Sequence, residues 1–356
     1  MATLSLAGIS AVLSLLYMDA MADNIRRDVL LPNLLSVEND QNGSCIWKGK
    51  FSGRTTAAAK AEGHDAADGD FSSHTRRQLT LAWAEYYAYA KVSGLSQAIN
   101  AANGGTGPGT DLLAEELIDA LDELSVVISS HTYAGDVGAA PAQLSGLAQA
   151  VDATGDYAGL AVATESEHAA GENSLALANL SVANLRTKLH RPFKDGCGMW
   201  PEFVTCPGDL WDAVSALFND QTRIVVSDVT TMSRGKVNIA QAGYRAIMVD
   251  GIPYIEDRHC TASTFYAHHS RFLSYRQMPP AGSQFSPSQL QGFIKALTGV
   301  TLEEDVIAAM VAKGGTRLQP YIEALSKTGD NMKAMVKWYG QLRLKRRNAA
   351  AKLLIT

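Results

Sequence analysis

Residues 110–135 read TDLLAEELIDALDELSVVISSHTYAG, and their apolar side chains follow the spacing of a helix with one buried face. The apolar positions recur at intervals of three or four residues: Leu113, Leu117, Leu121, Leu124 and Ile128. Thr110 or Asp111 can cap the start of this helix, and Gly135 suits its end. We therefore expect a helix over residues 111–133, roughly 35 Å long and the longest rigid element of the chain.

The chain has 356 residues, which is enough for two domains or one elaborated domain. Its net charge of -5 provides no general basic field for gripping nucleic acid. Four cysteines are too few for a secreted disulfide scaffold, so we expect free thiols in a reducing cytoplasm. No Lys or Arg precedes the apolar stretch 5–18, which is too short to span a bilayer, and we expect it to form a buried N-terminal arm.

A projecting loop is expected in the first quarter of the chain. Two stretches with strand character, 44–51 (SCIWKGKF) and 78–89 (QLTLAWAEYYAY), flank residues 52–77, where Phe71 is almost the only large apolar side chain. Such a segment cannot bury much surface by itself, so its composition predicts mobility in an isolated subunit and order only against a neighbour. The candidate contact residues of this region are Lys48, Lys50, Arg54, Lys60, Glu62, Asp65, Arg76 and Arg77.

Shorter elements are expected after the long helix. Periodicity predicts helices over 175–189 and 210–218, and strands over 223–227, 244–249, 252–256, 263–268 and 272–276. Asp250-Gly251 is a strong signal for a two-residue hairpin turn. Ser286-Pro287 and the capping-box pattern of residues 301–304 predict that the final seventy residues are helical.

The end of the chain is basic. From Asn331 onward there is no acidic residue, whereas seven are cationic: Lys333, Lys337, Arg343, Lys345, Arg346, Arg347 and Lys352. This asymmetry suits contact with a phosphate backbone, and it also suits contact with an acidic neighbouring surface. We favour the second interpretation and expect Lys345, Arg346 and Arg347 to make subunit contacts.

Residues 250–275, DGIPYIEDRHCTASTFYAHHSRFLSY, hold three His, one Cys, one Glu and two Asp, which is the composition of a metal or catalytic site. Neighbouring strand residues such as His268 and His269 point to opposite faces and cannot ligate one ion, and His259 and Cys260 have the same defect. We expect these polar side chains to lie on the wet face of a sheet.

Two other stretches are also set aside as sites. The glycine-rich run 104–109 lacks the Lys-Ser/Thr of a phosphate loop, and the carboxylates of the long helix fill its polar face. No catalytic residue, metal site or cofactor is therefore expected, and we expect that the protein is not an enzyme.

The order of these parts resembles the major capsid protein of tailed bacteriophages, a family with the Hong Kong 97 fold. Residues 110–135 look like the spine helix of that family and its exit, and residues 144–160 (LSGLAQAVDATGDYAGL) look like the start of its axial domain. Residues 244–273 are similar to its strand with Gly-x-Pro, here Gly251-Ile252-Pro253, and the return strands that follow.

This resemblance implies an α+β subunit with five parts. They are an N-terminal arm (1–44), an extended two-stranded loop (45–92), a peripheral domain (93–135 and about 263–285) with its spine helix, an axial domain (136–262), and a helical C-terminal extension (286–356).

The resemblance also implies a function. Many copies would assemble through hexamers and pentamers into an icosahedral virion shell around packaged double-stranded DNA, in the cytoplasm of a bacterial host. The implied partners are further copies of the chain, a portal, a separate scaffolding protein and DNA held without sequence specificity; no membrane is implied. The alternatives are an encapsulin-like shell and a cytoplasmic enzyme with residues 250–275 in its site.

Overall fold

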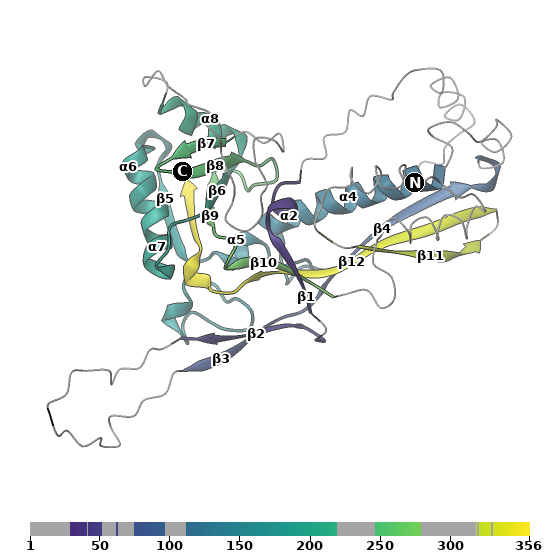
Figure 1. The fold of residues 1–356 in the computed structure, drawn as a ribbon, viewed down its shortest axis with the longest axis horizontal. Coiled ribbons are helices and arrows are strands. Elements are labelled where there is room, and N and C mark those ends of the chain that lie inside the picture. The colour runs from purple at the N-terminus through teal and green to yellow at the C-terminus, as the bar shows by residue number, and fades with distance from the viewer. Residues whose placement is uncertain are drawn as a thin grey trace. The chain divides into compact units, whose positions relative to one another are not determined.

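The computed structural model describes residues 29–40, 42–51, 62, 75–96, 112–218, 246–278, 318, 320–328 and 330–356. They belong to two compact units, the first built from 1–33, 85–128 and 279–339, and the second from 34–84, 129–278 and 340–356. Helices and sheets occur together in the described residues, so the predicted α+β class is confirmed (Figure 1). The predicted N-terminal arm up to residue 28 lies outside this description.

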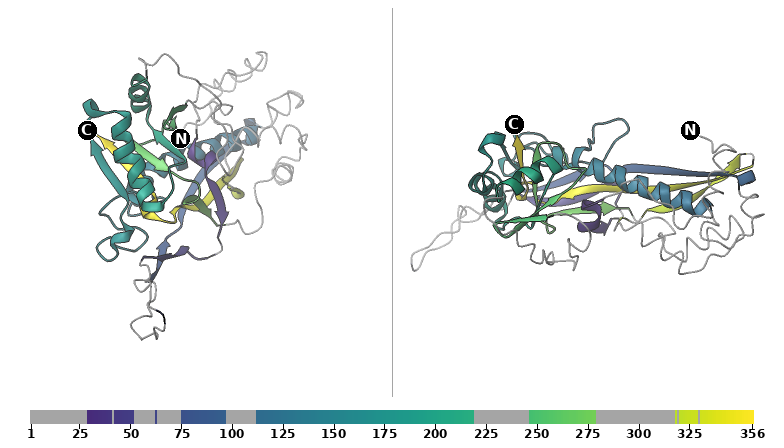
Figure 2. Two further views of the ribbon diagram at one scale, coloured as in Figure 1. Left: turned by 60° about the vertical axis from the view of Figure 1, so that its left-hand side comes forward. Right: turned by 90° about the horizontal axis from the view of Figure 1, so that it is seen from above.

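The first unit pairs the long helix with a sheet. Its elements are the first part of α4 (Leu112–Ala134), β4 (Ala84–Ser93), β11 (Tyr321–Thr328) and the first part of β12 (Asn331–Leu344). Both β4 and β11 pair with β12, and Figures 1 and 2 show α4 running along β4 and β12. The predicted helix over 111–133 is confirmed as α4, whose side chains at Leu117, Leu121, Leu124 and Ile128 are buried as expected.

The predicted helical C-terminal extension is wrong, because strands form most of the described chain from Tyr321 onward. Strands β11, β12 and β13 (Ala351–Ile355) occupy this region with only a short 3-10 turn, Arg347–Ala349, between the last two; residues 286–317 lie outside the description. In β12, buried Ala334, Val336 and Trp338 alternate at a spacing of two, and residues 340–344 are buried at every position. A central strand covered on both faces loses the alternation that separates a strand from a helix.

The second unit is built on a six-stranded sheet with the order β5-β13-β9-β6-β8-β7. The strands other than β13 are β5 (Gly171–Leu175), β6 (Phe203–Cys206), β7 (Ala246–Val249), β8 (Ile252–Glu256) and β9 (Thr264–His268). Asp250 and Gly251 join β7 to β8 with φ values of 53° and 79°, which confirms the predicted hairpin turn. The predicted strand over 223–227 lies outside the description.

Helices pack against this sheet through a single apolar core. They are α6 (Val182–Leu185), the π-helical turn η4 (Arg186–His190), α7 (Arg191–Cys197) and α8 (Gly208–Ala216). Leu189, Phe193 and Val214 from the helices meet Tyr254 and Phe265 from the sheet, all of them essentially inaccessible to solvent. The helix predicted over 175–189 begins only at Val182, and the one predicted over 210–218 matches α8 closely.

Strand β9 corrects two expectations. All five of its residues are buried, so its polar side chains do not lie on a wet face as predicted; β9 is an interior strand between β13 and β6. The domain boundary expected at 262/263 also separates β9 from β6 and β8, although all three belong to the same sheet. Residues 273–277 form β10, which instead pairs with β1 (Ser36–Asn39) and with the end of β12.

The cysteines and the described helices complete the description of the fold. All four cysteines are free, as predicted. No described helix combines the length and the apolar character needed to cross a bilayer.

Candidate functional site

The two ends of the segment predicted to project form a two-stranded hairpin of β2 (Cys45–Lys50) and β3 (Arg76–Leu81), visible in Figure 1. The arm predicted as one strand over 78–89 is in fact two, because β3 ends at Leu81 and β4 begins at Ala84 in another sheet. Residues 52–61 and 63–74, including Arg54, Lys60 and Asp65, lie outside the description.

The two faces of the hairpin differ in character. Cys45, Leu79 and Leu81 are buried on one face, whereas Lys48 and Lys50 are exposed on the other. Opposite them on β3 stand Gln78 and Arg76, both exposed. The outer face is therefore cationic, and no ion pair links Lys48, Lys50 or Arg76 to any described acid.

Aromatic contacts fix the inner face of the hairpin to the loop that precedes β5. The rings of Trp47 and Tyr157 lie 6.1 Å apart, and Phe51 meets His168 edge-on at 5.5 Å. Arg77 adds a salt bridge of 3.0 Å to Glu165. Lys50 and Arg76 therefore extend from a hairpin that these contacts anchor to the rest of the second unit.

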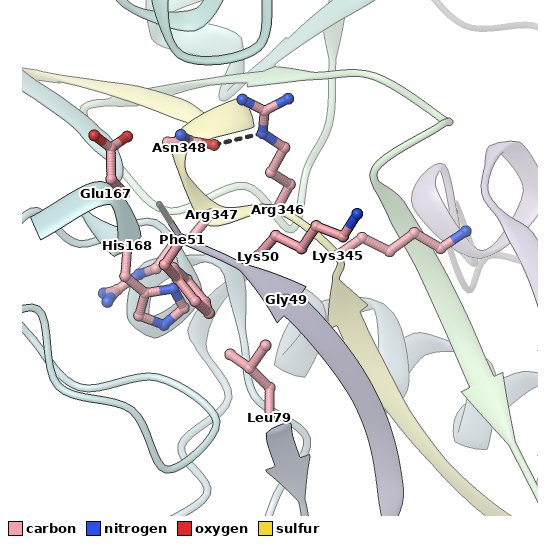
Figure 3. Close-up of a pocket in the computed structure, with 10 residues that line it drawn as sticks. All are labelled: Gly49, Lys50, Phe51, Leu79, Glu167, His168, Lys345, Arg346, Arg347 and Asn348. Atoms are coloured by element: carbon pink, nitrogen blue, oxygen red, sulfur yellow. Dashed lines mark hydrogen bonds between the residues drawn. The ribbon is translucent and has the colours of Figure 1, made fainter. Parts of the chain in front are cut away.

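A pocket of about 350 Å³ opens beside this base. It is lined by Gly49, Lys50, Phe51, Leu79, Glu167, His168, Lys345, Arg346, Arg347 and Asn348. Figure 3 shows Phe51 and His168 together at one side, and the side chains of Lys50 and Lys345 extending in the same direction.

Gly49 shapes the apolar side of this pocket. A Cβ at Gly49 would lie 2.8 Å from the ring of Phe51 and 3.1 Å from Leu79. The absence of a side chain lets the Phe51 ring fold back across β2. Burial lowers the pKa of His168, so this ring is neutral at pH 7 and adds aromatic surface without charge.

The cations of the basic segment have different surroundings. Lys345 donates to Glu38 at 3.2 Å, and exposed Arg346 donates to the carbonyl of Gly196 at 2.8 Å and to Asn348 at 2.9 Å. Arg347 is only 2% exposed and does not fit the expected role of a contact with another subunit. Its guanidinium donates to the backbone carbonyls of Gln149, Ala150 and Gly155 within its own chain.

A second charged group stands next to the pocket, centred on Glu38. Arg276 and Arg343 reach this carboxylate at 2.8 and 3.0 Å, and Lys345 does so as well. Partial burial acts to raise the pKa of Glu38, but Arg343, Lys345 and Arg276 together outweigh it and hold that pKa below the ordinary value. Sequence reasoning missed this group, because Glu38 lies about 240 residues or more from its partners in the chain.

The His and Cys residues of 250–275 serve the interior. His268 is buried and lies 2.9 Å from the hydroxyl of Thr205, and burial lowers its pKa to about 3. Asp257 accepts a 2.7 Å hydrogen bond from Tyr133 and thereby joins the end of α4 to the turn after β8. No cluster of three potential metal ligands occurs among the described residues.

The predicted contact residues are therefore brought together only in part. Lys50, Lys345 and Arg346 share the rim of one pocket, whereas Lys48, Arg76 and Arg77 lie on the hairpin beside it. Exposed Glu62 is described alone, without its neighbours. Phe51 and His168, which no sequence pattern links, form the apolar side of the pocket.

Comparison with known proteins gives likeness in structure only. No protein-family model and no curated protein matches the sequence. The capsid asymmetric unit of cyanophage A-1(L) matches with a TM-score of 0.65 at 18% identity, covering 95% of each chain.

Two other solved structures match at 11% identity and a TM-score of 0.54. One is the capsid of a native GTA particle, covering 99% of this chain and 100% of that one. The other is an encapsulin complex from Synechococcus elongatus PCC 7942, covering 96% and 94%. These likenesses confirm the predicted capsid fold of the Hong Kong 97 type.

Proposed function

We propose that this chain is a major capsid protein, whose copies assemble through hexamers and pentamers into an icosahedral shell around double-stranded DNA. One observation carries the proposal: the likeness to the cyanophage capsid subunit spans 95% of both chains. The likeness therefore extends over nearly the whole fold of both chains. Because one fold can serve several functions, assembly itself has to be tested.

The hairpin supports this function. It displays Lys48, Lys50 and Arg76 on an outer face that is cationic and exposed, while its inner face is anchored. A projecting, charged element on a firm base is suited to contact between subunits, and identical subunits use such contacts repeatedly when they close into a shell.

The described elements suggest a revised assignment of domains. We assign the peripheral domain to the first parts of α4 and β12 with β4 and β11, and the axial domain to the six-stranded sheet including β9 and β13. The extended loop then starts and ends at β2 and β3. A portal and a separate scaffolding protein are proposed partners, and assembly is proposed to occur in the host cytoplasm.

The second candidate is an encapsulin-like shell around a protein cargo. This candidate is supported by the match to the Synechococcus elongatus encapsulin, whose TM-score of 0.54 equals that of the GTA capsid. The two shells differ in what they hold: nuclease-resistant DNA supports the capsid, and a co-purifying enzyme with no protected DNA supports the encapsulin.

The test is to produce the chain in bacteria, first alone and then with the proposed scaffolding protein, and to examine the soluble fraction by gel filtration and negative-stain microscopy. The proposal predicts closed particles, or their hexamer and pentamer precursors, far above the 38.0 kDa of one chain. A single species of about one chain mass under both conditions contradicts it.

A further inference from the structure

The pocket at the hairpin base combines two kinds of surface. Phe51, Leu79 and the neutral ring of His168 provide an apolar side, whereas Lys50, Lys345 and Arg346 provide a cationic rim. Counting buried Arg347, four cationic side chains line the pocket against the single carboxylate of Glu167. The ligand that fits such a site has carboxylates on short aliphatic stems, because the charge can meet the rim while the stem covers the rings.

The cations of the rim are not equally available. Lys345 already donates to Glu38, and Arg346 binds two oxygen atoms of its own chain while remaining exposed. Lys50 has no acidic partner among the residues that the structure describes. An incoming carboxylate would therefore meet Lys50 first, with Arg346 beside it.

The sequence contains one segment with matching chemistry. Residues 61–70 read AEGHDAADGD and carry four carboxylates, Glu62, Asp65, Asp68 and Asp70, with no Lys or Arg. Their other residues are small apart from His64, which suits a pocket of about 350 Å³. Glu62, the described member of this segment, is exposed.

We infer that the acidic segment 61–70 of one copy binds the pocket lined by Lys50, Lys345 and Arg346 of a second copy. This inference rests on the proposed function, in which each copy meets identical neighbours. The segment and the pocket are different surfaces, so the contact is head-to-tail and repeats around a ring of subunits. Its strength should fall as salt rises, since the rim is exposed and the Debye length shortens to about 3 Å at 1 M.

The test uses reversed charges on the two sides of the contact. The pocket-reversed chain carries Lys50→Glu and Arg346→Glu, and the segment-reversed chain carries Asp65→Lys and Asp68→Lys. A matched control, Lys91→Glu with Arg191→Glu, makes the same charge change at two exposed positions that lie outside both the pocket and the hairpin. Chemical unfolding of each unassembled variant establishes that it folds before assembly is measured.

We expect each reversed chain alone to need about tenfold more protein for half-maximal assembly, while the control stays near wild type. Mixing the two reversed chains should restore assembly. The acidic segment of the pocket-reversed chain then meets the intact pocket of the segment-reversed chain, and the basic segment of the segment-reversed chain meets the acidic pocket of the pocket-reversed chain. Equal assembly by all variants would overturn the inference.

Two other outcomes also decide against it. If one chain carrying all four reversals assembles but the mixture does not, the segment binds the pocket of its own copy. If pocket-reversed shells form normally and lose only their DNA, the rim holds phosphates.

A peptide of residues 61–70 separates this inference from the proposed function. Fluorescence anisotropy with the full-length chain should show binding that the pocket reversal weakens about tenfold and the control reversal does not. A wild-type chain that binds the peptide in this way but forms no particle contradicts the proposed function and supports the contact. Particles without peptide binding through Lys50 and Arg346 contradict the contact alone.

Discussion

Replacing Arg347 by Met should destabilise the subunit strongly, although its position in the sequence suggested a surface residue. Its guanidinium donates at 2.8 Å to the carbonyl of Ala150, bonds Gly155 closely, and reaches Gln149 at 3.5 Å. Hydrogen bonds from a charged donor contribute about 1.5 to 3 kcal/mol each, and the lost partners would leave carbonyl groups unsatisfied. With two short bonds and one long one, and allowing for the cost of burying the charge, we expect a loss of about 3 kcal/mol.

The neighbouring residue provides the control. Arg346→Met removes the same charge one position earlier from an exposed side chain, so its cost should stay below about 1 kcal/mol. The measurement is urea unfolding of the unassembled chain, followed by fluorescence and compared at equal m-values. Equal losses for the two variants, or a larger loss at Arg346, would refute the assignment of Arg347 to the interior.

Three further predictions concern the same unit. Because the pKa of Glu38 is depressed in the folded state, its ion pairs stabilise the fold above about pH 4.5, and this contribution is lost on acidification. The free energy of unfolding should therefore decline less steeply between about pH 6 and about pH 3 in Glu38→Gln than in wild type. An unchanged slope would count against this role of Glu38. Tyr133→Phe deprives buried Asp257 of a donor and should cost about 1 to 3 kcal/mol in urea unfolding; a change below about 0.5 kcal/mol would contradict this. Gly196→Ala would force a Cβ into the carbonyl oxygen of Asn348 and should lower stability by about 3 kcal/mol. Gly198→Ala meets open space but has a φ of 77°, so it should cost only about 1 kcal/mol; the reverse order in urea unfolding would be inconsistent with this packing.

Local sequence signals predicted those elements that depend on local chemistry. The spacing of Leu117, Leu121, Leu124 and Ile128 predicted α4 and the face that it buries, because an apolar stripe at helical spacing has to be covered by the core. Asp250 and Gly251 likewise specify their turn, since both adopt the positive φ values that this turn requires.

The C-terminal strands could not be predicted in this way. Strand β12 pairs with β10, β11 and β4, so it is an interior strand of its sheet, and successive residues near its end are buried. With residues 340–344 buried throughout, the pattern of two disappears and a helix fits the sequence equally well. Pairing with strands more than sixty residues away decides the structure.

The candidate site shows the same limit. Charge predicted that Lys50 and Arg346 are contact residues, but not that they share a pocket, because about 300 residues separate them in the chain. The basic run gave no sign that Arg347 points inward while Arg346 points outward. That difference depends on free carbonyl groups near Ala150 and Gly155, which only the tertiary structure reveals.

Cryo-electron microscopy of the purified assembly tests the central claim most directly, because it shows both the particle and the placement of each subunit. The account predicts a closed icosahedral shell in which the chain forms hexamers and pentamers, with the β2–β3 hairpin of each copy against a neighbour. Particles without closed symmetry, or a preparation that contains only separate 38.0 kDa chains under all assembly conditions, would contradict it.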